Sequence, residues 1–295
     1  MADGPLRIAT RNSALALAQA GAVAERLGGA ELVEVSSDGE PGDKERFVRG
    51  VERALLDGEA DLGVHSAKDL PGEVPEGLAI VAVPEREDAG DVWIGAGASL
   101  EEVPDGARVG TASLRRRAQL LATRPGLDVT ELHGNVDTRL RRLAEGKLDA
   151  IVLARAGLRR LGREAEVAFS IPPDRMTPAA GQGALVVQAR AGDHETLGAV
   201  APIGDEDALR ELTAERAAVA LLGATCATPV GIHAKATAEG IEIEGFVGLP
   251  DGSDWIRDRV ELEAEEPAAV GAILAERLLG AGAREILSRA EGMGG

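Results

Sequence analysis

Residues 109–120 read VGTASLRRRAQL and combine a short β-type run, a turn and the start of an amphipathic helix. The spacing of apolar residues predicts the helix over residues 114–122. Thr111 or Ser113 can cap this helix, because a hydroxyl at its start accepts a hydrogen bond from the unpaired N–H groups of the first turn. A strand that leads through a turn into a helix is the repeating unit of an α/β protein.

Arg115 and Arg116 fall in the first turn of that helix, where positive charge opposes the helix dipole. A solvated helix face would be the purely structural explanation. Helix N-termini also bind anions, and a negatively charged ligand would offset the cost of this placement. We therefore interpret the turn as part of an anion site, and expect the loss of Arg116 to harm ligand binding more than stability.

The same strand–turn–helix pattern with basic residues recurs three more times. Arg11 and Ser13 lie in the turn of RIATRNSALALAQ. Arg139 lies on the helix of LHGNVDTRLRRL, and Arg160 lies near the end of AIVLARAGLRRLG. Ligands of open α/β sheets bind beyond the carboxyl ends of the strands. The four turns therefore predict one anion-lined cleft.

Short β-type runs alternate with helical patterns up to about residue 202, which is typical of α/β folds with mostly parallel sheets. The predicted strands are 6–9, 32–35, 61–64, 78–83, 108–110, 129–132, 150–154 and 184–188, and the predicted helices are 13–27, 47–56, 114–122 and 136–144. We find no internal repeat in the sequence.

The pattern changes after about residue 203. One long helix over 205–222 is followed by strands at 232–238, 241–247 and 255–262 and by a helix over 267–279. Glu239-Gly240 and Asp251-Gly252 are typical of hairpin turns. We therefore expect three domains, namely residues 1–84 with 184–202, residues 90–180, and an α+β domain of residues 205–295.

Charge is distributed unevenly along the chain, whose formal net charge is −18. Residues 108–160 nevertheless contain twelve Arg or Lys against five Asp or Glu. The acidic remainder disfavours nucleic acid and anionic membranes as partners, since both bind basic surfaces. A basic segment inside an acidic protein favours a small polyanionic ligand.

Several features predict a cytoplasmic protein without a bound metal. No apolar run reaches the ~18 residues of a membrane span, and MADGPLRIAT lacks the pattern of a secretory signal. Cys226 is the only cysteine, so no disulfide can form within the chain. The four histidines show no metal-ligand spacing.

Two further segments carry reactive side chains. In VHSAKDLP, Lys68 and Asp69 directly follow a strand, and Asp69 is either a carboxylate held for charge stabilisation or proton transfer, or part of a surface turn. In LLGATCATPVG, Cys226 is either a small buried side chain or a reactive thiol in a loop of small residues.

Taken together, these segments resemble the porphobilinogen deaminase, or hydroxymethylbilane synthase, family. The resemblance runs in order through RIATRNSALALAQ, VHSAKDLP, GTASLRRRAQL, GNVDTRL, DAIVLARAGLRRLG, PAAGQGAL and TAERA followed by GATCATPVG. It implies two α/β lobes similar to periplasmic-type binding proteins with a cleft between them, and a smaller α+β C-terminal domain. It also implies a monomeric transferase of tetrapyrrole (heme, porphyrin) biosynthesis that joins four porphobilinogens head to tail, releases four ammonia, and frees the linear tetrapyrrole by hydrolysis.

The resemblance also implies a role for each matching residue. Cys226 would hold a dipyrromethane cofactor through a thioether, and Asp69 would be the catalytic carboxylate. Cofactor-binding positions are Lys68, Thr111, Ser113, Arg115 and Arg116, and substrate-binding positions are Arg11, Ser13, Arg139, Arg160 and His133. The alternative is a non-catalytic anion-binding protein on a similar fold, which the presence of both Cys226 and Asp69 disfavours.

The sequence departs from the family pattern in two places. His133 stands where the family has Arg, and three interpretations stay open: it is protonated beside an anionic ligand, it donates as a neutral imidazole, or it has turned away while Arg142 or Arg155 takes its place. The segment SSDGEPGDKERF is shorter than its family counterpart, although Lys44 and Phe47 still match.

Overall fold

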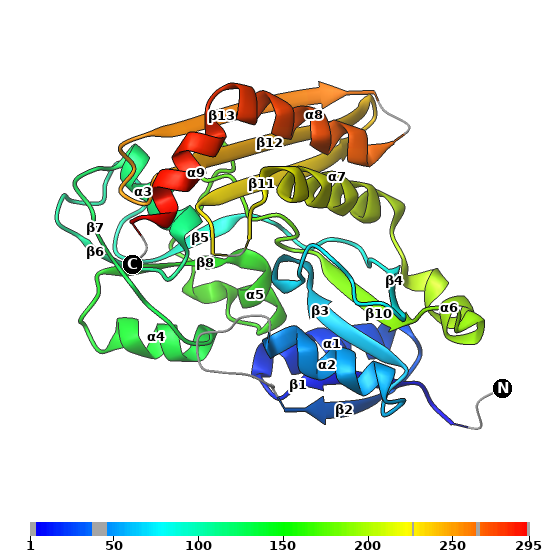
Figure 1. The fold of residues 1–295 in the computed structure, drawn as a ribbon. Helices are drawn as coiled ribbons and strands as arrows, with labels where there is room; N and C mark the ends of the chain where they lie inside the picture. Colours follow the sequence, from blue (N-terminus) through cyan, green and yellow to red (C-terminus); the bar gives the residue numbers. More distant parts are fainter. Residues whose placement is uncertain (1–3, 37–45, 226, 264–265, 294–295) are drawn as a thin grey trace. The chain divides into compact units, whose positions relative to one another are not determined.

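The computed structural model describes residues 4–36, 46–225, 227–263 and 266–293. The chain divides into two compact units, Met1–Glu87 with Gly183–Arg210 and Asp88–Gln182 with Glu211–Gly295. Figure 1 shows the helices and strands that build them. No helix among the described residues is both long and apolar enough to cross a membrane.

The sheet of the first unit has five strands in the order β2-β1-β3-β10-β4. The central strand β1 (Arg7–Arg11) runs parallel to β2 (Glu31–Val35) and to β3 (Leu62–Ser66). Strand β10 (Leu185–Arg190) runs antiparallel to β3 and to β4 (Leu78–Ala82). The strand predicted at 184–188 therefore belongs to the first unit.

Two helices cover opposite faces of this sheet. Ile8 points to the face where α1 (Ala14–Arg26) packs, and Ala9 to the face where α2 (Arg46–Leu56) packs, because successive strand side chains alternate between faces. The remaining helical elements of this unit are η1 (Ala67–Asp69), α6 (His194–Val200) and η3 (Ala201–Ile203). The carboxyl ends of β1 and β3 are left accessible to side chains from the turns that follow them.

The second unit contains a sheet with the same pattern of strand directions, in the order β7-β6-β8-β5-β9. The strand β6 (Arg108–Gly110) runs parallel to β7 (Asp128–Thr130) and β8 (Ala150–Ala154). Strand β5 (Asp91–Gly95) runs antiparallel to β8 and to β9 (Phe169–Ile171). The helical elements are α3 (Leu114–Thr123), α4 (Val136–Ala144), α5 (Arg155–Arg160) and η2 (Glu164–Glu166).

The expectation of mostly parallel sheets is wrong, because each five-stranded sheet has two parallel and two antiparallel pairings. Parallel neighbours need a crossover connection on the same sheet. The chain reaches β10 from the second unit and enters β5 from the first, so neither strand is bound by that requirement.

The two sheets also share one side-chain arrangement, although no repeat is evident in the sequence. In the first unit, Arg7 donates from Nε and Nη2 to the carboxylate of Asp61 at 3.2 and 3.0 Å. In the second unit, Arg108 makes the same two bonds to Asp149 at 3.1 and 2.9 Å. Each arginine opens its strand, and each aspartate precedes the next parallel strand by one residue. The two sheets are therefore structural equivalents with a common register.

A third, antiparallel sheet lies in the C-terminal part of the second unit and contains β11 (Val230–Thr237), β12 (Gly240–Gly248) and β13 (Trp255–Leu262). Both predicted hairpins are confirmed by this pairing. Its core includes side chains from the flanking helices, which are α7 (Glu206–Leu222), α8 (Pro267–Gly280) and α9 (Ala283–Glu291). The division into three domains stays a prediction.

Candidate functional site

Two sequence-predicted residues of the first unit meet in one small cavity of about 50 Å³. Its wall is made by Arg11, Leu15, Ala16, Gln19, Val48, Val51, Val64, His65, Ser66 and Asp69. Arg11 and Asp69 supply opposite charges to this wall, while Leu15 and Ala16 supply apolar surface. The cavity therefore combines an anion-binding group, a carboxylate and an apolar contact.

The topology of the sheet explains why Arg11 and Asp69 come together. Arg11 ends β1 and Asp69 ends η1, directly after β3. Since β1 and β3 are parallel neighbours, their carboxyl ends meet at one edge of the sheet. Ser13 caps α1 by accepting from the Ala16 N–H at 3.3 Å, and Arg11 Nη2 donates to Ser13 Oγ at 3.4 Å.

His65 also lines this cavity and is held uncharged at neutral pH. Burial lowers the pKa of its imidazole to about 4; the Gln188 side chain raises that pKa in opposition, and the charge of Arg11 lowers it further. In the same cavity wall, Gln19 Nε2 donates to Ser66 Oγ at 2.8 Å. The cavity wall thus contains a neutral ring and a fixed amide beside the charged pair.

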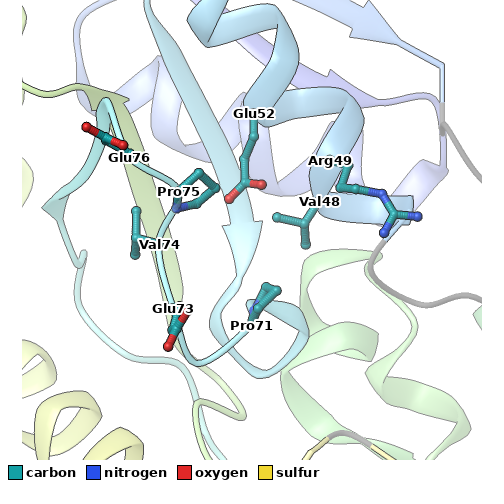
Figure 2. Close-up of a pocket in the computed structure, with 8 residues that line it drawn as sticks. All are labelled: Val48, Arg49, Glu52, Pro71, Glu73, Val74, Pro75 and Glu76. Carbon is teal, nitrogen blue, oxygen red and sulfur yellow. The ribbon is translucent and has the colours of Figure 1, made fainter.

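A larger cavity of about 360 Å³ lies between α2 and residues 71–76 (Figure 2). Its lining residues are Val48, Arg49, Glu52, Pro71, Glu73, Val74, Pro75 and Glu76. Three glutamates against one arginine make it unsuitable for a carboxylate-rich ligand. None of the sequence-predicted site residues lines it, so the smaller cavity is the better candidate site.

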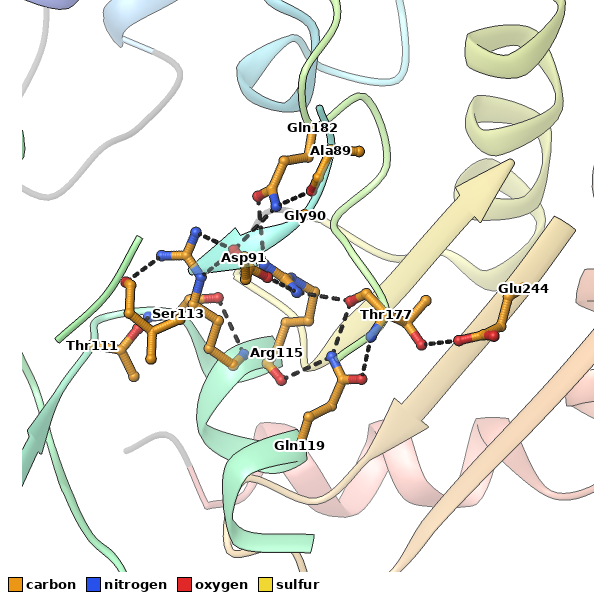
Figure 3. Close-up of polar contacts among 12 residues, drawn as sticks. Ala89, Gly90, Asp91, Thr111, Ser113, Arg115, Gln119, Thr177, Gln182 and Glu244 are labelled. Atoms are coloured by element: carbon orange, nitrogen blue, oxygen red, sulfur yellow. Dashed lines mark hydrogen bonds and ion pairs between the residues drawn. The ribbon is translucent and has the colours of Figure 1, made fainter. Parts of the chain in front are cut away.

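In the second unit, Arg115 and Arg116 both bind the carboxylate of Asp91, and Figure 3 shows Arg115 beside it. Arg115 Nη1 lies 2.8 Å from Asp91 Oδ2, and Arg116 Nη2 lies 2.8 Å from Asp91 Oδ1. The two arginine side chains are only 4% and 6% exposed, and Asp91 is fully buried. The two arginines in the first turn of α3 are thus part of a buried ionic cluster.

Further hydrogen bonds attach this cluster to the surrounding backbone. Arg115 Nη1 donates to the Thr177 carbonyl at 2.7 Å, and Arg116 Nη1 to the Val152 carbonyl at 3.0 Å. Gln182 Nε2 donates to Asp91 Oδ1 at 3.0 Å and to the Ala89 carbonyl at 2.6 Å. Both guanidinium groups are therefore fixed in orientation as well as paired.

The hydroxyl groups predicted at this turn also have defined places. Ser113 caps α3, since its Oγ accepts from the Arg116 N–H at 3.4 Å. Thr111 does not cap the helix; its Oγ1 accepts from the Ser113 N–H at 3.2 Å and shapes the turn. The structure thus brings Thr111, Ser113, Arg115 and Arg116 together around one helix N-terminus.

The other sequence-predicted residues belong neither to the lining of the smaller cavity nor to the ion pairs described above for the arginine cluster. His133 is 72% exposed, and its Nε2 lies 2.7 Å from Glu131 Oε1. Arg139 Nε donates to the Gly134 carbonyl at 2.8 Å. Lys68 lies in η1 and Arg160 ends α5, both half-buried. Cys226, Lys44 and most of the shortened segment fall outside the described residues.

One substitute considered for His133 already has protein partners. Arg155 donates from Nε to Glu164 Oε1 at 2.8 Å, and its Nη1 lies 3.3 Å from Asp88 Oδ2. A ligand would have to displace these carboxylates to take Arg155. This observation weakens the interpretation in which Arg155 replaces the family's arginine.

Sequence reasoning missed Asp91 and Gln182, which organise the arginine cluster. Asp91 is not among the residues that the sequence analysis singles out, and Gln182 appears there only within PAAGQGAL. Two unexplained arginines in a helix N-terminal turn imply a buried carboxylate partner, and an aspartate at the start of the apolar run VWI would have been a suitable candidate.

The fold and these two groups define an α/β protein with arginines at the helix N-terminal turns and a carboxylate at a strand end. Among the described residues, no three His, Cys, Asp or Glu side chains gather as a metal site would require. Two guanidinium groups share one carboxylate here, so this group of three side chains keeps one positive charge that a carboxylate of a ligand can neutralise.

Comparisons with known proteins agree with this class. Residues 6–198 match the family model of the porphobilinogen deaminase dipyromethane cofactor binding domain, and residues 209–280 match that of the porphobilinogen deaminase C-terminal domain. Porphobilinogen deaminase of Rubrobacter xylanophilus is 46% identical, covering 98% of this chain and 99% of that protein. Porphobilinogen deaminase of Syntrophus aciditrophicus is 42% identical, covering 97% and 99%. This chain therefore belongs to the porphobilinogen deaminase family.

Among solved structures, immunogenic lipoprotein A of Vibrio vulnificus is 16% identical to this chain with a TM-score of 0.42. The match covers 69% of this chain and 96% of that one.

Proposed function

We propose that this chain is a hydroxymethylbilane synthase, a transferase that acts on porphobilinogen. It joins four porphobilinogens head to tail, releases four ammonia, and hydrolyses the linear tetrapyrrole from its primer. It works as a monomer in the cytoplasm, with neither nucleic acid nor membrane as a partner. Membership of the porphobilinogen deaminase family supports this reaction.

The observation that carries the proposal is the shared cavity of Arg11 and Asp69. Porphobilinogen carries two carboxylates and one aminomethyl group. Its carboxylates need a cationic partner, and its aminomethyl group is compatible with a carboxylate nearby. Arg11 can bind a substrate carboxylate through two parallel hydrogen bonds. Ser13, bonded to Arg11, orients that guanidinium.

Asp69 stabilises the charge that develops when ammonia leaves. The bond between the methylene carbon and the protonated amine breaks with its electron pair on nitrogen, which leaves positive charge on the pyrrole and its methylene. A carboxylate in the cavity wall beside that charge lowers the barrier, because it stabilises the positive charge electrostatically. Leu15 and Ala16 add apolar surface to the same cavity wall.

The residues of the second unit fit the dipyrromethane cofactor. Arg115 and Arg116, with Thr111 and Ser113 of the same unit and Lys68 of the first unit, are proposed to hold its carboxylates, and Cys226 to attach it through a thioether. When bound, this group supplies the pyrrole carbon to which the first substrate is joined. Arg139, Arg160 and His133 are proposed to bind carboxylates of the substrate or the growing chain.

The proposal is tested by the intact mass of the purified protein. Wild type should exceed Cys226→Ser by the mass of a two-pyrrole adduct, far more than the exchange of sulfur for oxygen. Ala227→Ser places the same hydroxyl one residue away and should keep the adduct. An active wild-type protein with no mass difference from Cys226→Ser, after the exchange is allowed for, would contradict the covalent attachment.

A further inference from the structure

The arginine cluster of the second unit carries more positive than negative charge. Two guanidinium groups face one carboxylate, and in the described part of the chain no ion pair joins Arg115 or Arg116 to any acid other than Asp91. Arginine stays charged in proteins, so the three side chains together keep one positive charge. The N-terminus of α3 adds partial positive charge at the same place.

Such a cluster is costly without the aspartate. Burial lowers the pKa of Arg115, as does the charge of Arg116, and Asp91 raises it in opposition. Removing one partner of a buried ionic group leaves an uncompensated charge, which is strongly destabilising. Without Asp91, the two guanidinium groups would repel each other and turn towards water.

Asp91 itself occupies one of the most constrained places in the sheet. It opens β5, where its backbone pairs with Ala154 of β8 on one side and with Ile171 of β9 on the other. Gln182 Nε2 holds its carboxylate and the nearby Ala89 carbonyl together. The direction of both guanidinium groups is therefore set from the sheet.

The first unit has no charged residue at the positions equivalent to Asp91, Arg115 and Arg116, so these three charges occur as one group. Ser13 and Ser113 both cap their helices, so Leu15 and Ala16 correspond to Arg115 and Arg116. Ser66 and Ala154 are also equivalent, because each lies five residues after the equivalent aspartates Asp61 and Asp149. Leu185 pairs with Ser66, and Asp91 pairs with Ala154. Leu185 therefore corresponds to Asp91. The first unit thus has an apolar residue at all three places.

We propose that Asp91 is a positioning residue that aims Arg115 and Arg116 at a carboxylate of the bound cofactor. This inference rests on the proposed function. The cluster keeps one positive charge that a ligand carboxylate neutralises, and Asp91 keeps both guanidinium groups in the geometry that receives it.

The first test compares Asp91→Asn with Glu215→Gln. Glu215 is another fully buried carboxylate of the same unit, and it accepts from the Gly181 and Ala234 N–H groups at 2.6 and 2.8 Å. Each purified protein is incubated with porphobilinogen, and intact mass gives the fraction with the adduct, beside thermal unfolding. We expect the adduct fraction of Asp91→Asn to fall at least tenfold, and that of Glu215→Gln to match wild type even where its Tm falls.

A second pair of variants remains informative if Asp91→Asn does not fold. Arg115→Leu keeps Arg116 paired with Asp91 and has a cluster charge of zero, whereas Arg115→Leu with Asp91→Asn has a charge of +1, as in wild type. If net charge alone attracted the cofactor, the double variant would load better. Positioning by Asp91 predicts the reverse, with the single variant loading several-fold more adduct than the double variant.

The outcomes distinguish a failure of the proposed function from a failure of the role proposed for Asp91. No adduct on wild type would overturn the proposed function and this inference with it. An adduct on wild type and an equal fraction on Asp91→Asn would overturn the role of Asp91 alone. Better loading of the double variant than of Arg115→Leu would do the same.

Discussion

The two units place different chemistry on the same framework. Both have a parallel strand triad, an Arg–Asp pair at its base and a serine-capped helix at its carboxyl end. In the first unit, apolar residues after the cap leave a small cavity beside Asp69. In the second unit, Arg115 and Arg116 fill the same place and pair with Asp91. The two units therefore carry apolar and cationic side chains at equivalent positions after the helix cap.

The largest stability effect is expected where the two units differ most. Arg116→Ala should lower the free energy of unfolding by ~3–5 kcal/mol, because it breaks the buried ion pair of Arg116 with Asp91. The buried ion pair stands against the expectation from the sequence that the loss of Arg116 harms stability less than ligand binding, because that expectation considered only the helix dipole.

Urea unfolding measures this effect, with Arg117→Ala as the control. Arg117 is the next residue of α3, half-buried, and makes one hydrogen bond to the Val129 carbonyl. Equal destabilisation by the two substitutions would show that the pairing with Asp91 adds nothing to stability.

His65 allows a second comparison, since Leu153 is its equivalent in the second sheet, four residues after Asp149. The pKa of His65 is about 4 in the folded protein, below its ordinary value of 6.5. As the pH falls below 6.5, the His65 imidazole is protonated in the unfolded chain but stays neutral in the folded protein. The free energy of unfolding therefore decreases between pH 6.5 and pH 4. The shift corresponds to about 3 kcal/mol.

His65→Leu should remove this part of the acid sensitivity. Urea unfolding at pH 7 and pH 4.5 is the measurement, and wild type should lose more stability between the two than the variant. Identical losses in both proteins would show that His65 does not titrate below its ordinary range in the folded state.

The smallest effect concerns the feature that both units share. Ser13→Ala and Ser113→Ala each remove one helix cap and should each cost ~1 kcal/mol. Thermal unfolding of the two variants measures this directly. A several-fold larger cost for one of them would show that the two turns are not equivalent.

How far the sequence predicts the fold depends on whether the signal is local. The long helix α7 and both C-terminal hairpins are predicted, because their periodicity and turn residues lie within short windows. The directions of β5 and β10 are not predicted from the sequence, because they depend on where the chain returns from the other unit. The helix α9 is absent from the predicted elements, which end with the helix over 267–279.

The same distinction holds for the site. Ser113 as a cap and Arg11 at a strand end follow from local sequence, whereas the partner of Arg115 and Arg116 lies 24 to 25 residues away on another element. The roles of Cys226 and Asp69 came from family resemblance and stay predictions.

The assignment of catalysis to the first unit and of cofactor binding to the second is tested most directly with Asp69→Ala. Intact mass and turnover are determined on one preparation of this variant. Asp57→Ala, which removes an exposed carboxylate of the same unit, is the control. Asp69→Ala should carry the full cofactor adduct and an unchanged fold by circular dichroism, while ammonia release falls by ~10² or more, since one preorganised charge has been removed. Near-wild-type turnover, or loss of the adduct together with turnover, would contradict the assignment of catalysis to the first unit and cofactor binding to the second.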